Sequence, residues 1–247
     1  MEYFKWKFKG NKPLEIVALG DIHFGSNECD VDALKKTIKK IKKRNAKVIL
    51  TGDLIDFALK ESPGASIFEN NEQPMNQYYK ILDLLKPIQS QIIGSVIGNH
   101  EYRLTKVSGI DISRLLAEKI GCNYGKYQMV NSITVGKQKY NVFTTHGAVS
   151  AMTTEGRING FKKYLEQTDC DLYLVGHCHD LHDRVFFSRK IVGNKVVEIK
   201  KTLVLCGNFL KFDGGYGEMK GYPPLKLGCP LIKLYPNTHK VEVELEW

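Results

Sequence analysis

The sequence predicts a mixed α/β fold in which two mixed β-sheets pack face to face and helices flank them. Short apolar runs typical of buried strands recur along the chain, and several end directly at a polar motif. Amphipathic helical segments separate these runs in the first half, whereas strands dominate the second half. Two sheets between helices would bury the apolar residues of both halves.

The first half of the chain alternates predicted strands and helices. Residues 1–9 alternate aromatic and basic side chains, which predicts a strand with its aromatic residues on one face. Three apolar runs predict buried strands, at residues 14–19, 47–50 and 92–97. Three segments with an apolar stripe predict helices, at residues 31–44, 74–85 and 112–120. A polar segment rich in turn residues, 60–73, predicts a loop.

The lysines of residues 35–43 lie opposite the apolar stripe of their predicted helix, so a solvated face is favoured over a nucleic-acid contact.

The second half is predicted to be mostly strands. A helix is expected near residues 161–166, and the long segment 207–224 is expected to be a loop. The predicted strands are 132–135 and 140–143, which form a hairpin, then 171–175, 184–187, 202–206 and a final pair around 236–237. A further hairpin turn is expected at 193–194.

Composition predicts a single domain, residues 1–247, of an ordinary globular protein. The apolar fraction is 43% and the charged fraction is 26%, both usual for such proteins. Apolar runs are too short for a membrane span, and the first residues do not resemble a signal peptide. The six cysteines are widely spaced, which favours reduced thiols and a cytoplasmic location. The net charge of +9 points only weakly to a polyanionic partner.

Five short motifs follow one another in the chain and contain five of its seven histidines. They are Asp21-Ile22-His23, Gly52-Asp53, Gly98-Asn99-His100-Glu101, His146-Gly147 and Gly176-His177-Cys178-His179. Polar side chains at the carboxyl ends of strands converge on one site in open α/β sheets. Carboxylate, amide and imidazole donors together suit Mn²⁺, Fe²⁺, Zn²⁺ or Ni²⁺ better than Ca²⁺ or Mg²⁺. Two such ions about 4 Å apart can activate a shared water for attack on a phosphate.

The ordered set resembles the calcineurin-like metallophosphoesterase superfamily, whose blocks are D-x-H, G-D, G-N-H-[D/E], H and G-H-x-H. The resemblance covers residues 21–179 and implies a four-layer αββα sandwich. It implies that the first metal is held by Asp21, His23, Asp53 and His179. It implies that the second is held by Asp53, Asn99, His146 and His177, with Asp53 bridging. His100 corresponds to the acid that protonates the leaving oxygen, and manganese is the expected metal, with zinc, iron and nickel as alternatives.

The resemblance also bears on the substrate. Residues 52–58 lack the arginine that protein serine/threonine phosphatases carry there, and the Gly-His-x-His ending is similar to that of phosphodiesterases and repair exonucleases. We therefore expect a phosphodiesterase acting on DNA, RNA or a nucleotide, and no membrane partner. A phosphomonoesterase on a small metabolite or phosphoprotein is the alternative. A non-catalytic scaffold is a third hypothesis, which the intact ligand set disfavours. The oligomeric state is left open.

Four residues are candidates for substrate binding. Arg103 and Arg157 are expected either to clamp a phosphate or to form salt bridges. Lys211 and Tyr216 belong to the segment 207–224, whose basic and aromatic residues either contact a nucleic acid or pack the loop onto the sheet. Asp56 is expected either to orient a metal ligand or to cap the local turn.

Overall fold

The structure is a computed structural model that describes residues 1–59 and 72–247. Its strands form two six-stranded sheets, both mixed as predicted. The first sheet has the order β12 (Val241–Glu244), β11 (Leu231–Leu234), β2 (Leu14–Leu19), β3 (Lys47–Leu50), β4 (Ile92–Ser95), β5 (Asn123–Tyr124). The second has the order β1 (Glu2–Phe8), β6 (Gln128–Val135), β7 (Gln138–Thr145), β8 (Leu172–Val175), β10 (Lys195–Cys206), β9 (Leu181–Val192).

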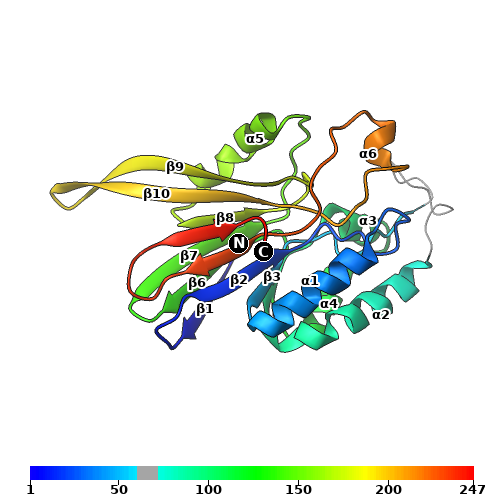
Figure 1. Ribbon diagram of the computed structural model, residues 1–247, viewed down its shortest axis with the longest axis horizontal. Helices are drawn as coiled ribbons and strands as arrows, with labels where there is room; N and C mark the ends of the chain where they lie inside the picture. Colours follow the sequence, from blue (N-terminus) through cyan, green and yellow to red (C-terminus); the bar gives the residue numbers. More distant parts are fainter. Residues whose placement is uncertain (60–71) are drawn as a thin grey trace.

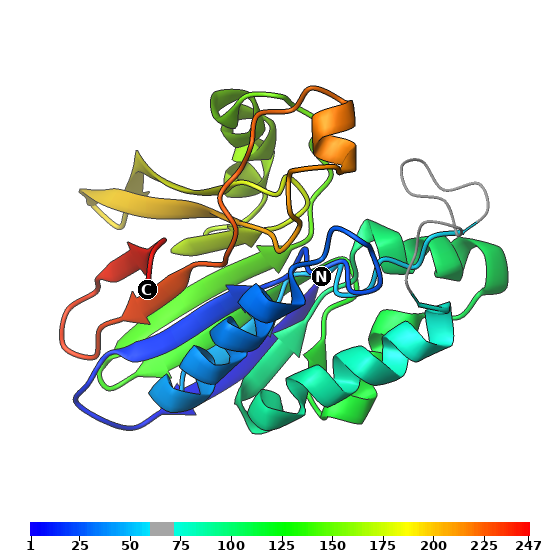
Figure 2. The same ribbon diagram turned by 45° about the vertical axis from the view of Figure 1, so that its right-hand side comes forward.

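Helices cover the outer faces of both sheets, which confirms the four-layer αββα prediction. The first sheet is covered by α1 (Val31–Arg44), α2 (Pro74–Leu85) and α4 (Ile112–Ile120), and the second by α5 (Thr154–Gln167) (Figure 1). Turning the molecule by 45° keeps α1 and α2 on one side and α5 on the other (Figure 2). Separate apolar clusters fill the three interfaces between these layers. No described helix is both long enough and apolar enough to cross a membrane.

Two of the predicted helices, α1 and α4, have the capping residues that the local sequence predicts. Asp30 caps α1 by accepting a hydrogen bond from the N–H of Ala33 at 2.9 Å. Leu34, Ile38 and Ile41 form the buried stripe of this helix, so its lysines face solvent. Gly121 ends α4 in the left-handed conformation that glycine adopts easily.

Several elements differ from the prediction. The helix α3 (Asn99–Ser108) was not predicted, because its one buried side chain is charged and it has no apolar stripe. The helix α5 starts seven residues earlier than expected, and a short helix, α6 (Tyr216–Met219), interrupts the predicted loop at 207–224. The strands β9 and β10 are longer than expected and pair with each other over twelve residues. The predicted loop 60–73 lies almost wholly outside the described residues.

Candidate metal centre

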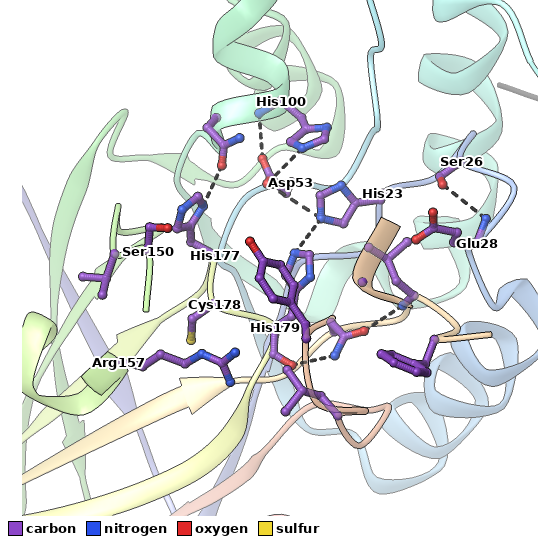
Figure 3. A pocket seen from close by; sticks show the side chains of 18 of the residues that line it. His23, Ser26, Glu28, Asp53, His100, Ser150, Arg157, His177, Cys178 and His179 are labelled. Carbon is purple, nitrogen blue, oxygen red and sulfur yellow. Dashed lines mark hydrogen bonds and ion pairs between the residues drawn. The ribbon is translucent and has the colours of Figure 1, made fainter. Parts of the chain in front are cut away.

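All five motifs lie where strands of the two sheets end, and their side chains point toward one place. Asp21 and His23 follow β2, Asp53 follows β3, and Asn99 and His100 open α3 just after β4. His146 follows β7, whereas His177 and His179 follow β8. The labelled histidines of this set surround Asp53 (Figure 3). Both sheets therefore contribute donors to one site, which forms only when the sheets are packed together.

The backbone at these motifs curls in a way that extended strands cannot. Five of the predicted ligands have a left-handed backbone, with φ of 46° at Asp21, 48° at His23, 49° at Asp53, 70° at His177 and 56° at His179. Such residues cost about 1–3 kcal/mol each and persist only where surrounding contacts hold them. The N–H of His177, for example, donates to the Asp21 carboxylate at 3.0 Å.

Two glycines let the segment after β3, which carries Asp53, approach the segment after β4, which carries Asn99. A Cβ on Gly52, which has a φ of +89°, would lie 2.6 Å from the backbone nitrogen of Gly98. A Cβ on Gly98 would lie 2.0 Å from Oδ1 of Asp53. Any other residue would separate the two segments, so these glycines bring the carboxylate next to the amide.

The donor atoms form two adjacent groups. In one, Nε2 of His179 lies 3.1 Å from Nε2 of His23 and 3.4 Å from Oδ1 of Asp21. In the other, Oδ1 of Asn99 lies 2.9 Å from Nε2 of His146 and 2.8 Å from Nδ1 of His177.

Asp53 lies between these groups. Its Oδ2 is 3.1 Å from Nε2 of His146 and 3.8 Å from Nε2 of His23. Clusters of three ligand atoms within 4.8 Å of one another are present in both groups. The converging nitrogen and oxygen donors fit two divalent cations that share one carboxylate.

The protonation of the site histidines depends on their burial and on neighbouring charged groups. Burial and the neighbouring His146 lower the pKa of His177 to about 4, so its imidazole is neutral, which is the form that binds metals. Burial also lowers the pKa of His23. Burial opposes the charged form of His146 as well, but the Asp53 carboxylate outweighs it and raises the pKa of His146 to about 10. A cation at this site must therefore displace a proton from His146.

His100 is held by Asp56 through one of its ring nitrogens. Nδ1 of His100 lies 3.1 Å from Oδ1 of Asp56 and 2.7 Å from the Asp56 carbonyl oxygen. The opposite nitrogen, Nε2, lies 3.1 Å from Nη2 of Arg103 and 4.0 Å from Oδ2 of Asp53. Burial lowers the pKa of His100, but the Asp53 and Asp56 carboxylates outweigh it and raise that pKa overall. Oδ1 of Asp56 also lies 3.6 Å from Nδ1 of His23, a predicted metal ligand. Of the two roles expected for Asp56, this contact is consistent with orienting a metal ligand.

Glu101 is a buried part of the site to which the sequence analysis gave no role. Its carboxylate accepts hydrogen bonds from the N–H groups of Asp53, Leu54 and Ile55 at 2.6–3.1 Å. It also accepts one from the N–H of Gly98, at the start of α3. Burial and the nearby Asp53 raise the pKa of Glu101 to about 7, although backbone N–H donors oppose this rise. A glutamate three residues after the residue preceding a helix is a capping signal that could have identified it.

A cavity of about 390 Å³ lies over the donor groups and contains three of the four substrate-binding candidates. Arg103 and Lys211 line it, and the backbone N–H of Lys211 donates to the Glu28 carbonyl. Arg157 also lines it, but its Nη1 lies 2.9 Å from Oδ2 of Asp180 and its Nε donates to the Ala151 carbonyl. Of the two roles expected for Arg157, a phosphate clamp or a salt bridge, the structure therefore shows the salt bridge.

The fourth candidate, Tyr216, is the first residue of α6, and its side chain lies outside the described part of the structure. Tyr222, from the same segment, lines the cavity. Cys178, between two of the histidines, is buried, and burial raises the pKa of its thiol to about 12. It fills space beside the site as an unreactive thiol.

Comparison with solved structures finds distant likenesses. A predicted phosphoesterase from Streptococcus pneumoniae is 14% identical, with 94% of this chain and 88% of that chain covered and a TM-score of 0.41. Vps29 of Entamoeba histolytica complexed with Zn²⁺ is 16% identical, with 94% and 97% covered and a TM-score of 0.41. GAP50 of Plasmodium is 10% identical, with 94% and 88% covered and a TM-score of 0.47.

A family comparison is more informative. None of the curated proteins matches the chain. The family model of the calcineurin-like phosphoesterases, however, matches residues 14–181. This match spans more than half of the chain and contains all five motifs. The chain therefore belongs to the calcineurin-like phosphoesterase family and is a metal-dependent hydrolase of phosphoric esters.

Proposed function

We propose that this protein is a dinuclear phosphodiesterase that hydrolyses phosphodiester bonds of nucleic acid or nucleotides. Asp21, His23 and His179 would hold one ion, and Asn99 with two histidines, 146 and 177, would hold the other. Asp53 lies between the two groups and would bridge them. When bound, the ions would activate a water and hold the phosphoryl oxygens. Manganese is the proposed metal, with zinc, iron and nickel as alternatives for this nitrogen and oxygen donor set.

The observation that carries this proposal is the extent of the cavity on both sides of the donor groups. Ser150 and Glu28 line the cavity, and they lie on opposite sides of the histidines (Figure 3). A phosphodiester has organic groups on both sides of its phosphorus, whereas a monoester has only one. A cleft that continues past the metal centre in two directions supports a diester as the substrate.

The charges that line the cavity support the same choice. Among the described residues, its arginines and lysines are Arg103, Arg157 and Lys211, and Arg157 is already paired with Asp180. A monoester at neutral pH carries up to two negative charges, whereas a diester carries one. Apart from the proposed metal ions, few cationic side chains are therefore available for the second charge of a monoester, which suits the diester.

One wall of the cavity is suited to a nucleobase. Phe212, Tyr222 and Pro223 contribute aromatic and apolar surface next to the metal centre. Aromatic side chains bind bases by stacking, with little dependence on sequence. Lys211, which also lines the cavity, would contact a phosphate of a longer substrate.

His100 is proposed to protonate the leaving oxygen. Because Asp56 engages Nδ1, the proton available for transfer would be one on Nε2, which lies 4.0 Å from Oδ2 of Asp53 and 3.1 Å from Nη2 of Arg103. Asp56 would keep the ring in this orientation. Arg103, next to Nε2, opposes a positive charge on the ring and would favour release of the proton.

The proposal is tested by measuring hydrolysis after supplementing purified protein with Mn²⁺. Bis-p-nitrophenyl phosphate, p-nitrophenyl phosphate, cyclic nucleotides, and single- and double-stranded DNA and RNA are compared. We expect diesters to be hydrolysed faster than monoesters, and polymer affinity to fall steeply with salt because phosphate contacts release counterions. Replacing Lys211 by Ala should reduce that salt dependence, whereas Asp53→Asn should abolish activity.

Two results would contradict the proposal. A preference for monoesters with a KM independent of salt would favour the phosphomonoesterase. Full metal occupancy without hydrolysis of any of these compounds would favour the non-catalytic scaffold.

A further inference from the structure

The hairpin of β9 and β10 extends beyond the rest of its sheet and points away from the other strands (Figure 1). β8 pairs with β10 only over residues 202–205, so the outer half of the hairpin is a two-stranded ribbon. β9 is the edge strand and pairs with β10 along its whole length. Within the described residues, the opposite edge of β9 has no strand partner. In the described part of the chain, this edge of twelve residues makes no backbone hydrogen bond to another segment.

The other edge strands of the described structure carry features that discourage pairing. β5 has only two residues. β12 has four residues, two of them glutamates, and β1 alternates lysines with its aromatic residues. Short strands and charged side chains are the usual means of blocking association at an edge. β9 also carries charged side chains, among them Asp183 and Arg189, but it is longer than any of these strands and has apolar side chains at its exposed end.

The two faces of β9 differ in what covers them. On the face toward α5, Lys190 is paired with Asp169 at 2.6 Å, and Lys162 lies over the ring of Phe186. The opposite face continues the inner face of the second sheet, but the first sheet does not extend over it (Figure 1). Phe187 is 64% exposed there and Ile191 is 75% exposed.

We infer that β9 pairs antiparallel with β9 of a second copy of this chain, so that the two second sheets become one continuous sheet. A two-fold axis relating the strands must be normal to the sheet, and each residue therefore meets a residue of the same face. The two residue numbers of every pair must then have an even sum.

The side chains of β9 are self-complementary when this axis passes through Phe186. Val185 then lies opposite Phe187 of the second copy, and Leu181 lies opposite its Ile191. Both of these pairs are apolar. Asp183 lies opposite Arg189, so that an acid meets a base.

Neighbouring registers are worse. With the axis through Phe187, Arg184 lies opposite Lys190 and Asp183 lies opposite an apolar residue. With the axis through Ser188, Asp183 lies opposite the hairpin turn and has no basic partner. Of these three registers, only the first pairs Asp183 with a base, and this charge complementarity supports a second copy as the occupant of this edge.

The inference is tested by sedimentation velocity of the full-length protein over a range of concentrations. We expect a species of twice the monomer mass of 28.0 kDa. Phe187→Lys and Ile191→Lys should each raise the dimer dissociation constant by about tenfold or more, because each change occurs twice at a two-fold interface. The matched control is Val196→Lys, which removes a similarly exposed apolar residue opposite Ile191, but on β10 rather than at the edge.

A charge exchange tests the register and the identity of the partner together. Asp183→Lys and Arg189→Glu should each weaken self-association, because each places like charges opposite one another. An equimolar mixture of the two variants should associate, since every charged pair is then complementary. Circular dichroism and hydrolysis of bis-p-nitrophenyl phosphate would verify that each variant is folded. If Asp183→Lys does not fold, the comparison of Ile191→Lys with Val196→Lys decides.

Three results would overturn the inference. The first is a wild-type protein that stays monomeric at its highest soluble concentration. The second is Val196→Lys weakening the dimer as much as Ile191→Lys does, which would indicate association through the open face rather than the edge. The third is a monomer whose affinity for nucleic acid falls with Arg189→Glu, which would make the hairpin a nucleic-acid contact.

Discussion

The ion pair between Arg157 and Asp180 is predicted to stabilise the wall of the cavity without binding substrate. Both residues are buried, with exposed fractions of 4% and 7%. Nη1 of the arginine lies 2.9 Å from Oδ2 of the aspartate, and Nε donates to the Ala151 carbonyl. Within the described residues, the other hydrogen-bond partner of that carboxylate is the hydroxyl of Thr154, at 2.7 Å. Removing the guanidinium would therefore leave a buried carboxylate with one neutral donor.

The perturbation that tests this prediction is Arg157→Met, which keeps most of the length of the side chain but removes its charge. Breaking a buried ion pair at one partner costs about 3–5 kcal/mol of unfolding free energy, because the remaining charge stays desolvated. For a chain of this size, 1 kcal/mol lowers Tm by about 2–4 °C, so we expect a fall of roughly 6–20 °C. In the double variant Arg157→Met/Asp180→Asn no charge remains, and the loss should be only about 1–2 kcal/mol.

The assay is urea denaturation followed by tryptophan fluorescence for the wild type, both single variants and the double variant. KM and kcat for bis-p-nitrophenyl phosphate are measured at a temperature at which all four are folded. The reasoning predicts a large stability loss in Arg157→Met, partial recovery in the double variant and a KM within about twofold of wild type. A stability change below about 1 kcal/mol with a tenfold increase in KM would refute it and would make Arg157 a phosphate-binding residue.

The remaining predictions concern catalysis, metal content and pH. His100→Asn should lower kcat by roughly 10²–10⁴-fold on a diester with an alkoxide leaving group, with both metals still bound; an unchanged rate would rule out its role as the acid. Asp53→Asn should reduce the metal content, measured by mass spectrometry, from two ions to at most one, and two ions in this variant would exclude the bridging role. Asp53 raises the pKa of His146 to about 10 against the effect of burial, so apparent metal affinity, measured by calorimetry, should rise by about tenfold per pH unit from pH 6.5 toward 10. In the metal-stripped protein, protonation of His146 adds to the free energy of unfolding. This contribution is fully present below pH 6.5 and is lost as the pH rises through about 10. A pH-independent metal affinity would contradict that account of His146.

Strands and helices with a clear burial pattern were predictable from the sequence. The run at 14–19 and the apolar stripe of 31–44 have the spacing that their burial requires, and both elements have the predicted bounds. The pattern failed where burial does not follow hydrophobicity. In the helix α3 the buried residue is Glu101, which is charged. In the outer half of the β9–β10 hairpin both strands are exposed. Neither the helix nor this part of the hairpin therefore has a periodic apolar pattern.

The sequence by itself determined which chemical groups the site contains. Each of the five motifs follows a strand end, and both the strand end and the motif are encoded by neighbouring residues. Only the tertiary structure decided which contacts those groups make. Asp56 meets His100 across 44 residues of chain, and Arg157 meets Asp180 because α5 packs on the strand that precedes the aspartate. Such pairings depend on how the two sheets and their helices pack, and residues distant in the sequence leave no local pattern from which that packing can be inferred.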